Sequence, residues 1–175
     1  VALRTGFGLS SADALVMIDA DLQYLPEDIP KLLGPIMNGQ KDLVNGWRVA
    51  RRDPKNRLIA SQIYNWFVRW LFHMDIHDNN SGFKAFRREV FEAVAHRPFR
   101  DFHRLLTPMA KHYGYRIGEI PVSHEARRTG QSKYSSLRRL LVGPFSLLEL
   151  KLELTRAKKR KNHSSRQSYR VGTAQ

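Results

Sequence analysis

Apolar and polar residues alternate along the chain in segments that predict strands and helices in turn. Short β-branched apolar runs predict strands, and apolar residues three or four positions apart predict helices. The predicted strands are 14–19, 42–47, 82–86 and 115–122, and the predicted helices are 27–38, 56–74, 87–94 and 101–113. This alternation indicates an α/β domain with a largely parallel sheet. Four strands are few for such a sheet, and the chain opens in a helix-like pattern without an N-cap, so we expect an N-terminally incomplete fold.

The longest predicted helix, 56–74, has two different faces. Its apolar stripe consists of Ile59, Ile63, Trp66, Phe67, Trp70 and Met74. Arg57, Ser61 and Asn65 are four residues apart and share the opposite face. An apolar stripe is typical of a helix packed in a core. A stripe this rich in aromatic residues also suits a membrane interface or a lipid groove, so both interpretations stay open.

An acidic pair directly follows the first predicted strand. The apolar run 14–18 ends at Asp19 and Asp21, which are separated by one small residue, and Gln23 adds a neutral oxygen nearby. Ligands of open α/β sheets bind at the carboxyl ends of strands, and oxygen ligands suit Mg²⁺ or Mn²⁺. Such a pair taken alone is more often a turn or a helix N-cap. The metal interpretation therefore depends on the rest of the chain.

The net charge of +14 indicates an anionic partner, which could be nucleic acid, anionic lipid or a phosphorylated substrate. Seven of these charges come from segment 156–175, which has no acidic residue and which we expect to be disordered. The absence of cysteine excludes disulfides and thiolate metal sites, and no apolar run is long enough to span a membrane. No helix-turn-helix, RRM or zinc-finger signature is present, so nucleic-acid binding ranks last.

Five segments, in order, resemble family 2 glycosyltransferases, in particular the polyprenyl-phosphate branch that includes dolichyl-phosphate mannose synthase. They are Asp-Ala-Asp-Leu-Gln at 19–23, Gly-Trp-Arg at 46–48, the helix 56–65, Asp-Asn-Asn-Ser-Gly-Phe with the basic residues after it at 78–88, and the closing group 102–106, 114–122 and 127–134. The resemblance implies a GT-A fold, which is the Rossmann-like fold of nucleotide-diphospho-sugar transferases. It also implies metal-assisted transfer of a sugar from a nucleotide sugar to polyprenyl or dolichyl phosphate, with inversion.

The resemblance also implies roles for single residues. Asp19 and Asp21 would be catalytic and would hold Mg²⁺ or Mn²⁺ on the donor diphosphate together with Gln23. The implied ligands of the acceptor phosphate are Arg48, Arg57 and Ser61. The implied loop and donor-phosphate residues are Asp78, Ser81, Arg127 and Lys133. Each of these side chains also has an ordinary interpretation as a turn, surface or helix residue.

The resemblance divides the chain into three parts. Residues 1–134 would be the C-terminal part of a GT-A catalytic domain, 135–155 an amphipathic helical segment and 156–175 a basic disordered tail. The implied partners are GDP-mannose or a UDP-sugar, polyprenyl phosphate and a membrane surface, without nucleic acid, and the implied location is peripheral on the cytoplasmic face of a membrane.

The donor sugar and the activity of the chain alone stay open. Mannose is the favoured sugar, and glucose and N-acetylglucosamine are the alternatives. Nothing in the sequence matches the family's Asn-Glu loop, which binds the nucleotide base. The alternative function is therefore a non-catalytic fragment that binds polyprenyl phosphate or a partner chain.

Overall fold

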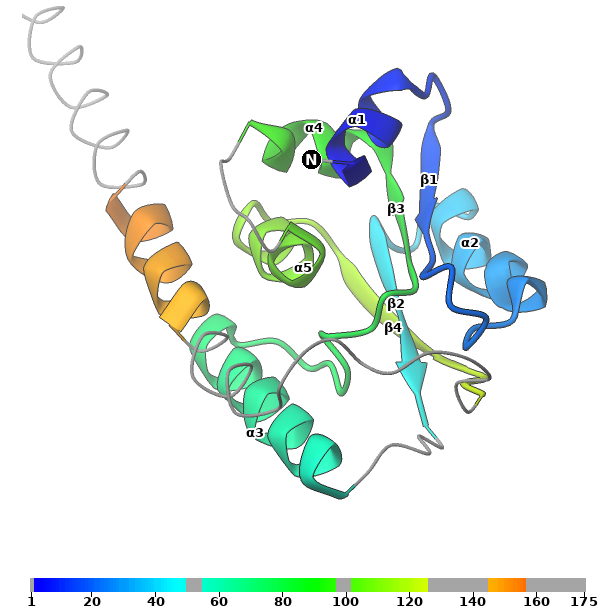
Figure 1. Ribbon diagram of the computed structural model, residues 1–175. Coiled ribbons are helices and arrows are strands. Elements are labelled where there is room, and N and C mark those ends of the chain that lie inside the picture. Colours follow the sequence, from blue (N-terminus) through cyan, green and yellow to red (C-terminus); the bar gives the residue numbers. More distant parts are fainter. Residues whose placement is uncertain (1, 50–54, 97–101, 126–144, 157–175) are drawn as a thin grey trace, which may run out of the picture.

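The computed structural model describes residues 2–49, 55–96, 102–125 and 145–156. Its strands are β1 (Ala14–Met17), β2 (Leu43–Arg48), β3 (Lys84–Arg87) and β4 (Ile117–Val122). Its helices are α1 (Ala2–Leu9), the 3-10 turn η1 (Pro26–Asp28), α2 (Ile29–Met37), α3 (Lys55–Phe72), α4 (Arg88–Ala95), α5 (Phe102–His112) and an unlabelled helix over 145–156. The strands form one sheet with helices on both sides (Figure 1). The predicted strands and helices named above are all present.

The sheet is mixed, which makes the prediction of a largely parallel sheet wrong. Its order is β1-β3-β2-β4, and β3 runs antiparallel to both of its neighbours, whereas β2 and β4 are parallel. The reason lies just before β3, where the amide of Gly46 donates to the carbonyl of Phe83 at 2.8 Å. The chain therefore enters β3 beside the carboxyl end of β2. A strand that begins there runs back along its neighbours.

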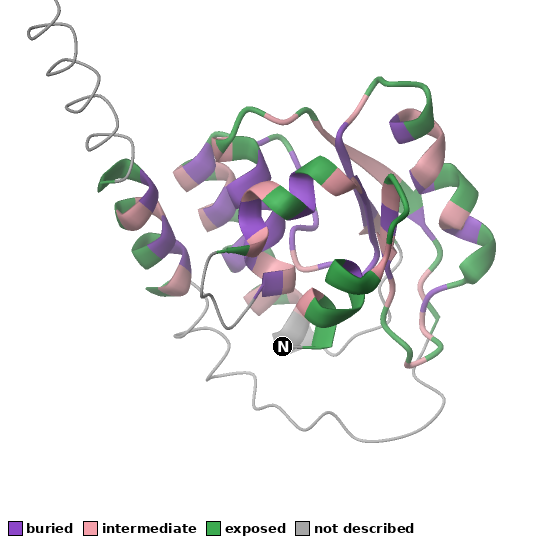
Figure 2. Ribbon diagram, turned by 90° about the horizontal axis from the view of Figure 1, so that it is seen from above, coloured by how far each residue is buried: buried purple, intermediate pink, exposed green. Residues whose placement is uncertain are grey.

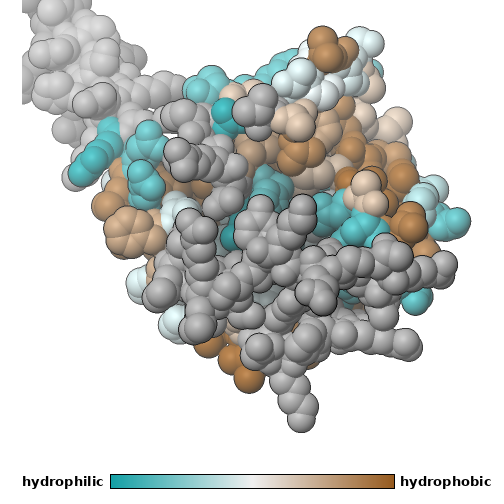
Figure 3. All heavy atoms as spheres, in the orientation of Figure 1, coloured by the Kyte–Doolittle hydropathy of each residue, from teal (hydrophilic) through white to brown (hydrophobic). Residues whose placement is uncertain are grey.

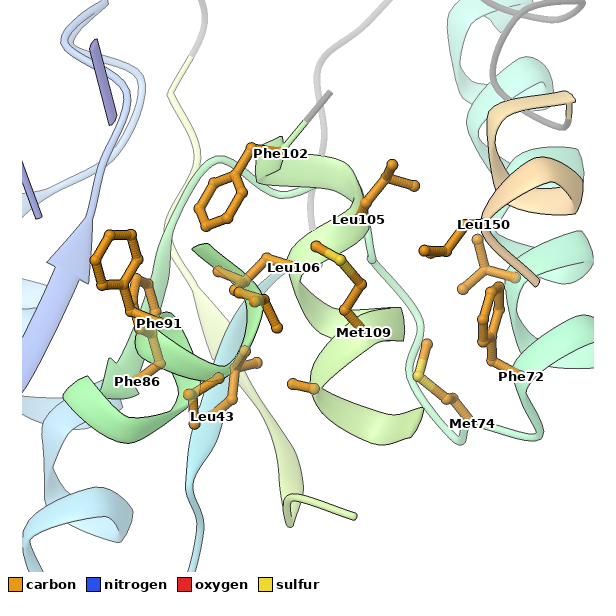
Figure 4. Close-up of a cluster of buried hydrophobic side chains, with 14 of the residues drawn as sticks. Leu43, Phe72, Met74, Phe86, Phe91, Phe102, Leu105, Leu106, Met109 and Leu150 are labelled. Atoms are coloured by element: carbon orange, nitrogen blue, oxygen red, sulfur yellow. The ribbon is translucent and has the colours of Figure 1, made fainter. Parts of the chain in front are cut away.

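Strand side chains alternate between two apolar layers, one on each face of the sheet. Leu43 and Phe86 belong to the larger layer, which includes residues of α4 and α5 and is drawn in Figure 4. The neighbouring strand residues point to the other face. Val44, which follows Leu43, and Ala85, which precedes Phe86, pack in the smaller layer with Leu32 of α2. Figure 2 shows buried residues on the strands and exposed residues on the outer sides of the helices.

Helix 145–156 lies next to the end of α3 that contains Phe72 and belongs to the larger layer (Figure 1). Its Leu147, Leu150 and Leu154 are fully or almost fully buried, and the ammonium of Lys151 lies 5.2 Å from the centroid of the Phe72 ring. This helix thus shares a core with the α/β part. The domain boundaries stay a prediction, since residues 126–144 and 157–175 lie outside the described ranges.

The apolar stripe predicted on α3 is largely exposed, so the core interpretation is wrong for most of it. The exposed fractions are 56% for Ile59, 47% for Ile63, 59% for Trp66 and 61% for Trp70. A second apolar set, Tyr64, Val68 and Phe72, faces the core instead. Because α3 has apolar residues on two sides, periodicity alone could not select the packed one. Apolar side chains are visible at the lower left edge of Figure 3, over α3.

Candidate active site

The acidic segment after β1 lies against the loop that leads into β3. A Cβ atom added to Gly82 would lie 2.0 Å from Oδ2 of Asp19, far closer than any real contact. Position 82 must therefore be glycine for the Asp19 carboxylate to stay where it is. Asp19 itself is exposed to solvent.

Asp21 and Gln23 form a tight turn beyond Asp19. The amide of Gln23 donates to Oδ1 of Asp21 at 3.3 Å, and Leu22 between them has a positive φ of 60°. The side-chain amide of Gln23 donates to the carbonyl of Glu125 at 3.1 Å. A turn role for Asp21 is compatible with metal binding, because a carboxylate has four lone-pair positions. Within the described ranges, His, Cys, Asp and Glu form no group of three or more that could hold a metal ion.

A partly buried ion pair lies at the carboxyl end of β2. Nε and Nη2 of Arg48 donate to Oδ2 and Oδ1 of Asp78 at 2.6 and 2.9 Å, in the two-point geometry that makes such pairs strong. Glu119 of β4 holds the backbone beneath Asp78. Its carboxylate accepts from the amide of Asp78 at 2.7 Å and from the amide of His77 at 2.8 Å. The Asp78 carboxylate is therefore fixed from both its backbone and its side chain.

Tyr24 joins the two segments. Its hydroxyl lies 3.2 Å from Oγ of Ser81 and accepts a hydrogen bond from the amide of Gly82 at 3.1 Å. Oγ of Ser81 also accepts from the amide of Phe83 at 3.2 Å. Burial raises the pKa of the Tyr24 hydroxyl above its usual range, so the hydroxyl is neutral at physiological pH. Tyr24 thereby fixes the loop that carries Ser81 and Gly82 next to the segment that follows Asp19.

A lysine is completely buried beneath this site. Nζ of Lys84 donates to Oδ1 of Asn45 and to the carbonyl of Asn79, both at 2.9 Å. Burial lowers the pKa of Lys84 to about 7, although the negative charge of Asp78 opposes this shift.

Four of the predicted site residues lie together along the 78–82 segment and the ends of β1 and β2, namely Asp19, Arg48, Asp78 and Ser81. Ser61 is partly buried on α3, and Arg57 belongs to the same helix, but its side chain is not among the described parts. Arg127 and Lys133 lie outside the described residues. The roles of all these residues stay predictions.

Three residues that build this site, Tyr24, Lys84 and Glu119, are not among those predicted from the sequence. Glu119 had a weak signal, since it is two residues from Ile117 in the strand and therefore lies on the same face of the sheet, which packs against the larger layer. Lys84 lies between apolar neighbours in a short strand, which is typical of a surface-facing lysine rather than a buried one.

The match to a family model decides the classification. The model described as "Glycosyl transferase family 2" matches residues 1–95, which is more than half of the chain. The chain belongs to glycosyl transferase family 2.

Two curated relatives of this family 2 chain have the same name. The chain is 34% identical over 137 residues to the undecaprenyl-phosphate 4-deoxy-4-formamido-L-arabinose transferase of Yersinia pestis (strain Pestoides F), and the match covers 78% of this chain and 41% of the relative. The transferase of the same name from Pseudomonas aeruginosa (strain LESB58) is 33% identical over 139 residues, covering 79% and 40%. The family 2 chain thus spans about two fifths of the length of these relatives.

Solved structures confirm the GT-A fold for this family 2 member. Glucosyl-3-phosphoglycerate synthase from Mycobacterium tuberculosis, crystallised with Mn²⁺, UDP and phosphoglyceric acid, superposes with a TM-score of 0.62 at 19% identity. The superposition covers 87% of this chain and 52% of the synthase. The same enzyme with Mn²⁺, UDP-glucose and phosphoglyceric acid gives a TM-score of 0.60 at 18% identity, covering 83% and 53%.

Proposed function

We propose that this chain is the acceptor-binding and metal-binding part of a glycosyltransferase that moves a sugar from a nucleotide sugar to a polyprenyl phosphate. The observation that carries the proposal is the convergence of Asp19, Asp78 and Arg48 at one edge of the sheet. The names of the curated relatives, which are undecaprenyl-phosphate sugar transferases, support the acceptor class.

The donor set fits a hard divalent cation. Asp19, Asp21 and Gln23 supply carboxylate and amide oxygens, which are the ligands that Mg²⁺ and Mn²⁺ prefer. A bound cation would neutralise charge on the donor diphosphate. The Mn²⁺ present in structures of the fold relatives is consistent with this assignment.

The chain's own residues would bind and orient the acceptor. Asp78 holds the Arg48 guanidinium in a fixed plane, and a guanidinium is suited to a phosphate. Arg57 and Ser61 would complete the acceptor site from α3. A phosphate is already anionic at neutral pH, so its attack on the anomeric carbon needs no general base. Catalysis then rests on alignment and charge stabilisation, and direct displacement inverts the sugar.

A membrane surface is the proposed location of the acceptor. Helix 145–156 also has exposed apolar side chains, with exposed fractions of 73% for Phe145, 44% for Leu148 and 51% for Leu152. Aromatic and aliphatic side chains on adjacent surface helices suit the headgroup region of a bilayer. Among the described ranges, no helix combines the length and apolar character needed to cross a bilayer. We therefore propose peripheral association, on the cytoplasmic face.

The test of activity is transfer of radiolabelled sugar to undecaprenyl or dolichyl phosphate with Mg²⁺ or Mn²⁺. The donors are GDP-mannose, UDP-glucose and UDP-N-acetylglucosamine, with UDP-4-deoxy-4-formamido-L-arabinose added because of the curated relatives. Both this chain and a version extended upstream of residue 1 are assayed. Turnover that Asp21→Ala abolishes supports the proposal. If neither protein turns over any donor, the enzyme function is wrong, and binding of polyprenyl phosphate without transfer would support the alternative function.

Membrane association is tested by flotation with vesicles of phosphatidylcholine and phosphatidylglycerol. We expect the Trp66→Ser/Trp70→Ser variant to float less than the wild type. Met37→Ser is the matched control, because Met37 is 72% exposed on α2, away from the stripe. Equal flotation of all three proteins would contradict membrane binding through α3.

A further inference from the structure

A network of polar side chains lies inside the larger apolar layer, between the sheet and helices α3 and α5. Its members are Asn45, Asn65, Asn79, Lys84 and Thr107, all of them buried. Burying such groups costs free energy unless each one is hydrogen-bonded. Within the described residues, Nδ2 of Asn45 and Oδ1 of Asn79 have no hydrogen-bond partner. A network with this cost is poorly explained by stability alone, which points to a role in fixing positions.

Asn79 is the junction of the network. Its backbone amide donates to Oδ1 of Asn65 on α3 at 3.2 Å, and its side-chain Nδ2 donates to the carbonyl of Arg104 on α5 at 2.9 Å. Its carbonyl accepts from Nζ of Lys84 on β3. Three separate elements therefore hold one residue of the loop, and its position cannot change without breaking one of these contacts.

The residue before this junction is Asp78, which binds Arg48 at two points. On the other side of the junction, Asn65 lies on the same α3 face as Arg57 and Ser61, at a spacing of four residues. The path from α3 to the Arg48 guanidinium thus passes through the hydrogen bond from Asn79 to Asn65, the peptide unit between Asp78 and Asn79, and the two hydrogen bonds from Arg48 to Asp78.

We infer that Asn65 is a positioning residue that, through Asn79, holds the acceptor face of α3 at a fixed separation from the Asp78–Arg48 pair. Lys84 holds Asn79 from the opposite side, so α3 and the pair behave as one rigid unit. The inference rests on the proposed function for the identity of the ligand, a polyprenyl phosphate. The mechanical coupling between α3 and Asp78 does not depend on that identity.

Trp47 provides a reporter that needs no activity. Its ring stacks on that of His77 with centroids 4.2 Å apart and an angle of 14° between the planes, and His77 directly precedes Asp78. The chain has three tryptophans, and Trp66 and Trp70 are the other two. In a Trp66→Phe/Trp70→Phe background, tryptophan fluorescence therefore reports only on the Trp47 stack.

The variants are Asn65→Leu, which removes the acceptor oxygen and keeps the number and branching of the side-chain heavy atoms, and Asn65→Asp, which keeps an oxygen at that point. The matched control is Thr107→Val, since the Thr107 hydroxyl donates to Asn45 at 3.1 Å and so belongs to the same network at a different residue. We expect Asn65→Leu to change the Trp47 fluorescence, and Asn65→Asp and Thr107→Val to match the background. If Asn65→Leu does not fold, as judged by circular dichroism, Asn65→Ala replaces it. Unchanged Trp47 fluorescence in folded Asn65→Leu, or in Asn65→Ala where it replaces that variant, would overturn the coupling.

Steady-state kinetics in the active form of the protein test the link to the acceptor. We expect Asn65→Leu to raise the KM for polyprenyl phosphate about tenfold, as for one lost hydrogen bond, with the KM for the nucleotide sugar unchanged. A merely structural role would lower kcat by reducing the active fraction and leave both KM values unchanged, which would refute the inference. If the fluorescence responds but no protein transfers sugar, the coupling stands and the proposed function is wrong.

Discussion

Replacing the buried Lys84 by methionine is the sharpest test of how charge is distributed under the site. Methionine has nearly the same length and no titratable group. The substitution removes the hydrogen bonds from Nζ to Asn45 and Asn79. Oδ1 of Asn45 keeps its hydrogen bond from Thr107, whereas the carbonyl of Asn79 loses its donor, which costs about 1–3 kcal/mol at every pH. It also removes a contribution to the free energy of unfolding that depends on pH.

The pH-dependent part follows from the pKa of Lys84. Burial lowers it from 10.5 to about 7, and each unit corresponds to about 1.36 kcal/mol. Above pH 10.5 neither the folded nor the unfolded chain holds this proton, and no penalty is present. As the pH falls towards 7, the unfolded chain binds the proton before the folded chain does. The free energy of unfolding therefore falls, by at most about 5 kcal/mol. Below pH 7 both states are protonated and the penalty is constant.

The assay is urea unfolding of the wild type and Lys84→Met at intervals between pH 6.5 and 10, followed by circular dichroism. The free energy of unfolding of the wild type minus that of Lys84→Met should rise with pH, by about 1.4 kcal/mol per unit in the middle of the window. The constant cost of the lost hydrogen bonds cancels in this slope. A difference that stays level from pH 7 to 10 would show that Lys84 titrates near its ordinary pKa, and the reasoning on its burial would be wrong.

Two further substitutions test the loop beside Asp19. Gly82→Ala places a Cβ atom where Asp19 now lies, so we expect Mn²⁺ affinity, measured by titration calorimetry, to fall at least about tenfold. Gly34→Ala is its control, because a Cβ there meets nothing within 4 Å, and an equal effect of both would contradict the prediction. Tyr24→Phe removes the hydroxyl that binds Ser81 and the amide of Gly82. It should lower the free energy of unfolding by about 1–3 kcal/mol in urea at pH 7, and an unchanged midpoint would refute this.

Local sequence patterns were sufficient to predict the strands and helices and part of the candidate site. The predicted strands and helices exist because their signals depend on neighbouring residues only, such as the apolar run that becomes β1. The end of that run indicated Asp19, and the turn residues around Asp78 and Ser81 indicated those two. These features come from the order of residues along the chain, and the resemblance to family 2 added the names of their proposed ligands.

The tertiary structure decided everything that depends on residues distant in sequence. The direction of β3 follows from the return of the chain to the carboxyl end of β2, and the exposed side of α3 follows from which side α5 and helix 145–156 cover. The contacts that build the site join Arg48 to Asp78, Glu119 to Asp78 and Asn65 to Asn79. The periodicity of apolar residues along the chain cannot predict these contacts, because they depend on how whole helices and strands pack together. Burial therefore made Lys84 part of the site, although its sequence neighbours gave no sign of it.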